Sequence, residues 1–195
     1  RALKAYTNDK GIELFGDMPI YVAHNSVDVW SAPDNFLLDD AGQPYVVAGC
    51  PPDALSVEGQ RWGNPLYNWT TQKARGFDWW IARMERMLDL FDIIRVDHFR
   101  AFAGFWEIDA KEETAVNGRW VSAPGHDLFR TFADEMPKAP IVAEDLGLIT
   151  PDVDELRLAF DLPGMKIVQF EIGEHPIDEN KLPVHYPARS VTYIG

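Results

Sequence analysis

The sequence predicts an α/β protein in which strands and helices alternate, as they do in a (β/α)8 TIM barrel. Residues 93–97 and 141–144 are short β-branched runs, typical of buried parallel strands, and each ends in an acid, Asp97 or Glu144. Parallel α/β folds place their chemistry at the C-terminal ends of the strands. The stretch between the two acids is long enough for a helix that leads the chain back to the sheet, so we expect the two strand ends to be neighbours.

The remaining elements follow the same order. Thr150 and Pro151 open one helix with an N-cap and a first-turn proline. Apolar side chains at helical spacing define another helix, over 77–91. The expected strands are 13–17, 93–97, 141–144, 165–170 and 191–194, and the expected helices are 77–91, 128–136 and 150–160.

Two long excursions interrupt this pattern, at about 31–70 and 101–125. The first is predicted to contain a hairpin that pairs 36–38 with 45–48. In the second, Asn117-Gly118 predicts a two-residue hairpin that joins 114–116 to 119–121. Loops of this length are usually functional.

The whole chain, 1–195, is interpreted as one partial catalytic barrel domain. Five strands cannot close an eight-stranded barrel. The sequence opens without a methionine and stops after a strand-like run, so we expect the incomplete central fragment of a larger barrel, with long βα-loop insertions.

Composition limits the partners. A net charge of −13 argues against nucleic acid or an anionic membrane surface. The single cysteine, Cys50, allows no intrachain disulfide and favours a reducing compartment, so we expect a cytoplasmic protein. Aromatic residues make up 12% of the chain, and Trp62, Tyr67 and Trp69 lie in a polar, Gly/Pro-rich stretch. Flat rings beside polar side chains suit sugar rings.

Three acids are predicted at strand ends: Asp17, Asp97 and Glu144. Arg95 projects to the same side of its strand as Asp97 and keeps that carboxylate ionised, which a nucleophile requires. Glu144 has no cation within its own strand, so we expect a raised pKa and an acid role. Asp17 alone could equally be a helix cap or a loop acceptor.

Other chemistries lack their motifs. The histidines have no HExxH or CxxC spacing, and there is no GxGxxG or GxSxG. We interpret His98 as a partner of a sugar hydroxyl or a carboxylate rather than of a metal ion. No metal or organic cofactor is expected.

Long motifs carry a resemblance over nearly the whole chain. Residues 16–23, 47–53, 59–67, 95–100, 143–147 and 162–166 closely resemble the 4-α-glucanotransferase family. This family, also called amylomaltase or disproportionating enzyme, is glycoside hydrolase family 77 of the α-amylase clan. The resemblance implies retaining transfer of α-1,4-glucan segments by double displacement. The implied partners are maltooligosaccharides, amylose or glycogen-derived α-glucans, with no nucleic acid and no membrane.

The resemblance also implies roles for individual residues. Asp97 matches the nucleophile, Glu144 the general acid/base and Arg95 the partner of the nucleophile. The residues that match or adjoin expected substrate contacts are Asp17, Gln60, Trp62, Asn64, His98 and Glu174. A third family carboxylate would follow the strand over 191–195, beyond the last residue of this chain.

Two other functions compete with transfer. An α-amylase-type hydrolase would use the same two carboxylates, because water and a sugar hydroxyl compete for the same glycosyl-enzyme. A non-catalytic glucan-binding protein is the alternative from a different class, although paired strand-end acids beside an arginine are costly to keep without a purpose. The aromatic loop over 60–69 favours transfer, because it can hold an acceptor and restrict water.

Overall fold

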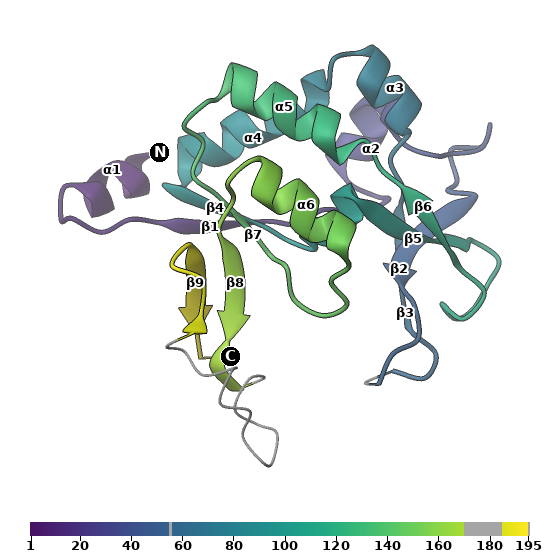
Figure 1. Ribbon diagram of the computed structural model, residues 1–195. Coiled ribbons are helices and arrows are strands. Elements are labelled where there is room, and N and C mark those ends of the chain that lie inside the picture. Colours follow the sequence, from purple (N-terminus) through teal and green to yellow (C-terminus); the bar gives the residue numbers. More distant parts are fainter. Residues whose placement is uncertain (55, 170–184, 195) are drawn as a thin grey trace.

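The computed structural model describes residues 1–54, 56–169 and 185–194 (Figure 1). The strands are β1 Phe15–Met18, β2 Val46–Cys50, β3 Gln60–Pro65, β4 Ile93–Val96, β5 Gly104–Asp109, β6 Arg119–Ser122, β7 Ile141–Ala143, β8 Gly164–Ile167 and β9 Ser190–Tyr193. The α-helices are α1 Ala2–Asn8, α2 Val27–Ser31, α3 Trp69–Ala74, α4 Asp78–Leu90, α5 Gly125–Glu135 and α6 Pro151–Ala159. Two short 3-10 helices, η1 Pro33–Asn35 and η2 Phe99–Phe102, complete the described elements. No helix among them is long and apolar enough to span a membrane.

The predicted parallel strands lie in the predicted order. β4 pairs in parallel with β1 on one side and with β7 on the other. The Ala143 N–H donates to the Pro163 carbonyl over 2.8 Å, so the chain entering β8 runs beside β7. β8 then pairs in parallel with β9. β8 ends at Ile167, earlier than the expected 165–170.

Helices cover one side of this parallel sheet, with α4 and α5 above it in Figure 1. The prediction over 77–91 is confirmed by α4, in which Trp80 and Met84 are fully buried. Gly76 and Phe77 both have positive φ, and this turn separates α4 from α3. α6 begins as predicted after Thr150, but the threonine hydroxyl accepts from Arg100 instead of capping the helix.

A second, antiparallel sheet has the order β3-β2-β5-β6 and lies apart from the parallel strands in Figure 1. It corrects both hairpin predictions. The run over 36–38 makes only isolated bridges, because both edges of β2 are occupied by β3 and β5.

The expected hairpin at Asn117-Gly118 is also wrong: β6 pairs with β5 across a longer connection. Gly118 is not among the glycines with positive φ that a two-residue turn of this kind needs. It packs instead against Trp106, whose Nε1 would lie 2.2 Å from a Cβ placed at Gly118. The Trp106 indole donates to the Ala115 carbonyl over 2.9 Å, which holds the connection in this form.

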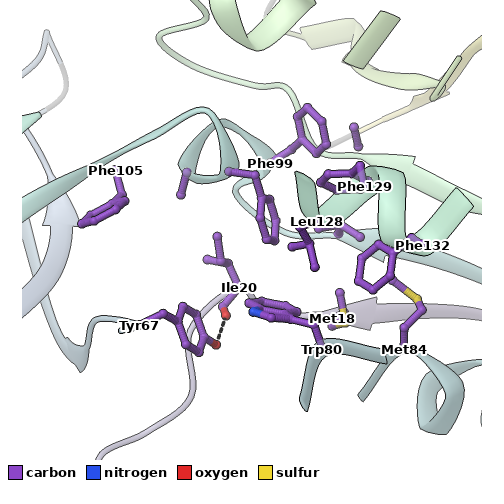
Figure 2. Packing of buried hydrophobic residues seen from close by; sticks show 14 of the residues in the cluster. Met18, Ile20, Tyr67, Trp80, Met84, Phe99, Phe105, Leu128, Phe129 and Phe132 are labelled. Atoms are coloured by element: carbon purple, nitrogen blue, oxygen red, sulfur yellow. Dashed lines mark hydrogen bonds between the residues drawn. The ribbon is translucent and has the colours of Figure 1, made fainter. Parts of the chain in front are cut away.

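The main core joins both sheets through aromatic side chains (Figure 2). Trp80 of α4 packs against Tyr67 and Phe102, and the Tyr67 hydroxyl donates to the Ile20 carbonyl over 2.5 Å. Truncating Trp80 to alanine should cost about 3–5 kcal/mol. Tyr67 is 1% exposed and Trp69 stacks on Trp80, so the expectation that these two rings contact sugars is wrong. Their rings fill the core, and only Trp62 of that group faces solvent.

Candidate active site

Strand register brings Asp17 and Asp97 to one arginine. In the β1–β4 pairing Asp17 lies opposite Arg95. Arg95 Nη1 donates to Asp17 Oδ1 over 2.6 Å, and its Nη2 lies 2.9 Å from Asp97 Oδ1. Although burial lowers the pKa of Arg95, the two carboxylates raise it overall, so the guanidinium stays charged. One fixed cation therefore faces two strand-end acids, as the sequence predicted for Asp97.

The two candidate catalytic acids leave neighbouring strands. The Asp97 N–H donates to the Met18 carbonyl over 3.1 Å, and the Glu144 N–H donates to the Val96 carbonyl over 3.0 Å. Both bonds continue the parallel ladder by one residue past the strands. The prediction that the two strand ends are adjacent is confirmed.

Glu144 is held by backbone amides and is mostly shielded from water. Its Oε2 accepts from the His98 N–H over 2.8 Å, and its Oε1 accepts from the Leu146 N–H over 3.1 Å. Burial raises the pKa of Glu144, and the nearby Asp97 charge adds to this. The amide bonds and Arg95 act in the opposite direction, but the pKa remains above its ordinary value. A raised pKa keeps a larger share of this carboxyl protonated near neutral pH.

His98 connects the acids to the antiparallel sheet. Its backbone is left-handed, with φ 49° and ψ 49°, and its N–H donates to Glu144. Burial, aided by the Arg100 charge, lowers the pKa of the imidazole to about 4, so the ring is neutral. The His98 ring meets Trp62 edge-on at 4.9 Å between centroids.

Every second residue of β3 carries an amide or the indole. Trp62 is 37% exposed, and its Nε1 donates to Gln60 Oε1 over 3.1 Å. Tyr21 lies on the other flank of Trp62, at 6.1 Å between ring centroids. Asn64 Nδ2 donates to the Val22 carbonyl over 3.0 Å, which ties β3 to the segment that follows β1. Contact of these three side chains with sugar stays a prediction.

The described residues bring most of the predicted site together. Glu174 lies outside the described residues. No group of three or more His, Cys, Asp and Glu within the described ranges could hold a metal ion.

Sequence reasoning missed two buried groups beside the acids. Arg100 lies 3.9 Å above the Trp120 ring and donates to Thr150 Oγ1 over 3.1 Å. Asp145 forms an ion pair with Arg157 of α6. Asp145 follows Glu144 directly, which was a signal, but nothing in the sequence showed that Arg157 turns inward.

An arginine-bound carboxylate beside a second carboxyl with a raised pKa is the usual equipment for chemistry at a glycosidic bond. The comparisons with known proteins agree. The model of the family described as 4-alpha-glucanotransferase matches residues 1–195. The chain belongs to this 4-alpha-glucanotransferase family.

Over the aligned stretch, curated relatives are about half identical to this chain. It is 51% identical over 196 residues to a 4-alpha-glucanotransferase of Thermus thermophilus, covering 100% of this chain and 39% of the relative. It is 45% identical over 195 residues to the chloroplastic/amyloplastic 4-alpha-glucanotransferase of Solanum tuberosum, covering 100% and 34%. The chain therefore spans less than two fifths of the length of these relatives.

Two solved amylomaltase structures have the same fold as this chain. Amylomaltase from Streptococcus agalactiae, solved in complex with acarbose, matches with a TM-score of 0.95 at 43% identity, over 100% of this chain and 39% of that one. Amylomaltase from Corynebacterium glutamicum matches with a TM-score of 0.82 at 21% identity, over 98% of this chain and 27% of that one, and shows the fold alone.

Proposed function

We propose that the full-length protein is a 4-α-glucanotransferase that moves α-1,4-glucan segments between sugar chains with retention of configuration. One observation carries this proposal: Asp97 forms an ion pair with Arg95 and leaves its strand next to the strand that ends in Glu144. Neighbouring strands lie about 4.8 Å apart. Acids leaving such strands fit the separation of roughly 5–5.5 Å used by retaining enzymes better than the wider gap of inverting ones.

In the first displacement, Asp97 attacks the anomeric carbon while Glu144 gives its proton to the departing glycosidic oxygen. The C–O bond to the leaving sugar breaks as the C–O bond to Asp97 forms. Arg95 holds the nucleophile in place through their ion pair. Because its pKa is raised, Glu144 can hold the proton that it donates in this step. Two backbone hydrogen bonds orient its carboxyl.

In the second displacement, Glu144 takes the proton of an acceptor hydroxyl, whose oxygen attacks the same anomeric carbon and releases Asp97. Two inversions give net retention, and Glu144 ends protonated as it began. Trp62 and the neutral His98 form one wall beside the two acids. An indole face that stacks on a glucose ring favours a sugar over water at this step.

The remaining predicted residues fit contacts with glucose hydroxyls. Asp17 is the more exposed partner of Arg95 and can accept from a hydroxyl. Gln60 and Asn64 lie two residues before and two residues after Trp62 in β3. Glu174 stays an expected acidic contact. The proposed substrates are maltooligosaccharides, amylose and glycogen-derived α-glucans.

The finer fold follows from the same proposal. The strands β1, β4, β7, β8 and β9 would be an arc of a (β/α)8 barrel, with 1–195 as part of the catalytic domain. The antiparallel sheet and its loops would be the insertions, over about 31–70 and 101–125. The lone cysteine of this chain favours a reducing compartment and so a cytoplasmic location.

Incubating the full-length protein with maltotriose tests the function. We expect glucose together with a ladder of oligomers longer than the substrate. Shorter products alone would identify a hydrolase, and unchanged maltotriose that nevertheless binds would identify a glucan-binding protein. The α anomer should be the first product seen by NMR.

A further inference from the structure

The acid that follows Glu144 makes contacts that the proposed mechanism does not use. The Asp145 side chain is 10% exposed. Its Oδ1 accepts from the Met165 N–H of β8 over 2.7 Å, and its Oδ2 lies 3.1 Å from Arg157 Nε of α6. Burying this carboxylate is costly unless it is paired and hydrogen-bonded, and both conditions are met.

Arg157 is itself fixed from further sides. Its Nη1 donates to the Leu162 carbonyl over 3.1 Å, and its Nη2 lies 3.4 Å from Asp154. Gly164 allows the close approach of β8, because a Cβ there would lie 2.4 Å from Asp145 Oδ2. The Asp145 carboxylate is therefore clamped between the start of β8 and the side of α6.

This clamp acts on the backbone that holds Glu144. The peptide after Asp145 carries the Leu146 N–H, which donates to Glu144 Oε1. Gly147 follows with φ 84°, a left-handed conformation that glycine readily adopts. A fixed Asp145 side chain fixes the Leu146 N–H, and the N–H fixes one oxygen of the catalytic carboxyl.

We propose that the Asp145–Arg157 pair is a positioning device for the general acid/base Glu144. The inference rests on the proposed function of Glu144. The pair does not touch the substrate; it holds the Glu144 carboxyl at the angle from which the proton reaches the glycosidic oxygen. A misplacement near 1 Å can cost about 100-fold in rate.

The test compares two donors in the full-length protein. Maltotriose needs its leaving oxygen protonated, whereas the fluoride of α-maltosyl fluoride leaves without that help. For Asp145→Asn we expect kcat on maltotriose to fall about 10- to 100-fold with little change in KM. On maltosyl fluoride the first displacement should fall less than threefold.

Two further variants separate positioning from folding. Gly164→Ala keeps every charge but presses on Asp145, so it should reproduce the donor-dependent loss in a weaker form. Glu155→Gln is the matched control, because it removes an exposed acid from the same helix that forms no described contact with Arg157 or Asp145, and it should leave both donors unaffected. Thermal melting of each variant reports stability independently.

An equal loss on both donors in Asp145→Asn and Gly164→Ala would overturn the inference and leave a purely structural ion pair. Full activity of both variants on maltotriose would overturn it as well. Glu144→Gln, run alongside, tests the proposed function itself. If that variant shows no donor dependence, the acid role fails; if only the Asp145 and Gly164 variants lack it, the positioning role fails.

Discussion

The two sheets of this molecule build the candidate site in different ways. In the parallel sheet, register between adjacent strands sets Asp17 against Arg95, and Glu144 leaves β7 beside Asp97. In the antiparallel sheet, β3 presents its side chains only because β2 is held between β3 and β5. The parallel sheet, whose strands pair in chain order, therefore supplies the charged side chains of the site. The antiparallel sheet, which is assembled by pairing between distant segments, supplies the aromatic ring.

The largest expected effect tests the parallel sheet. Asp97→Asn removes the nucleophile, so transfer by the full-length protein should fall about 10⁴-fold or more. The rate of oligomer formation from maltotriose measures it. Asp109→Asn is the matched control, since Asp109 ends β5 of the antiparallel sheet and, among the described contacts, its carboxylate accepts only from the Lys111 N–H. Comparable losses in both variants would show that the parallel sheet does not supply the catalytic acid.

The next effect separates the two acids of the parallel sheet. Glu144→Gln cannot donate a proton, so transfer from maltotriose should fall about 10²- to 10⁴-fold. A donor with a very good leaving group should restore formation of the glycosyl-enzyme in this variant and not in Asp97→Asn. Rapid-quench detection of the first product distinguishes them. Loss without rescue in both variants would remove the division of roles.

The sequence predicted the parallel sheet better than it predicted the antiparallel sheet. The strands of residues 93–97 and 141–144 were predictable, because β-branched runs and their terminal acids are local signals and their pairing follows chain order. The pairing of β2 with β5 joins residues far apart in the chain, and no local pattern announced it. Trp62, Tyr67 and Trp69 had the same polar surroundings in sequence, but Trp62 is exposed, Tyr67 is core and Trp69 packs against the core.

The positions that escaped prediction share a physical cause. His98 adopts a left-handed backbone, which residues other than glycine rarely favour, and its N–H bonds to Glu144, which is distant in sequence. Arg157 lies on a helix face that charge alone would assign to water. Both depend on tertiary partners that are distant in sequence.

A moderate effect tests the antiparallel sheet. Trp62→Ala removes the indole that lies against His98, so the acceptor sugar should bind more weakly and water should compete better. We expect the ratio of hydrolysis to transfer to rise about tenfold, measured as glucose released against oligomer formed. Trp120→Ala, at the exposed edge strand β6, is the control and should leave the ratio unchanged. An unchanged ratio in Trp62→Ala, with both reactions reduced together, would show that the ring only anchors β3.

The smallest effect concerns Asn64, which follows Trp62 by two residues in β3. Its Nδ2 already donates one of its two hydrogens to the Val22 carbonyl, so a sugar could reach this side chain only through the second Nδ2 hydrogen or Oδ1. Asn64→Ala should lower the free energy of unfolding by about 1 kcal/mol, the usual worth of such a bond. The hydrolysis-to-transfer ratio should stay as in the unmodified protein.

Chemical denaturation and the product ratio, measured on the same samples, give both numbers for Asn64→Ala. Asn117→Ala is the control, because that amide bonds only to the exposed Glu112 among its described contacts and should change neither. A rise in the ratio approaching that of Trp62→Ala, without loss of stability, would place Asn64 on the sugar. In that outcome β3 would bind the acceptor along its whole face rather than through one ring.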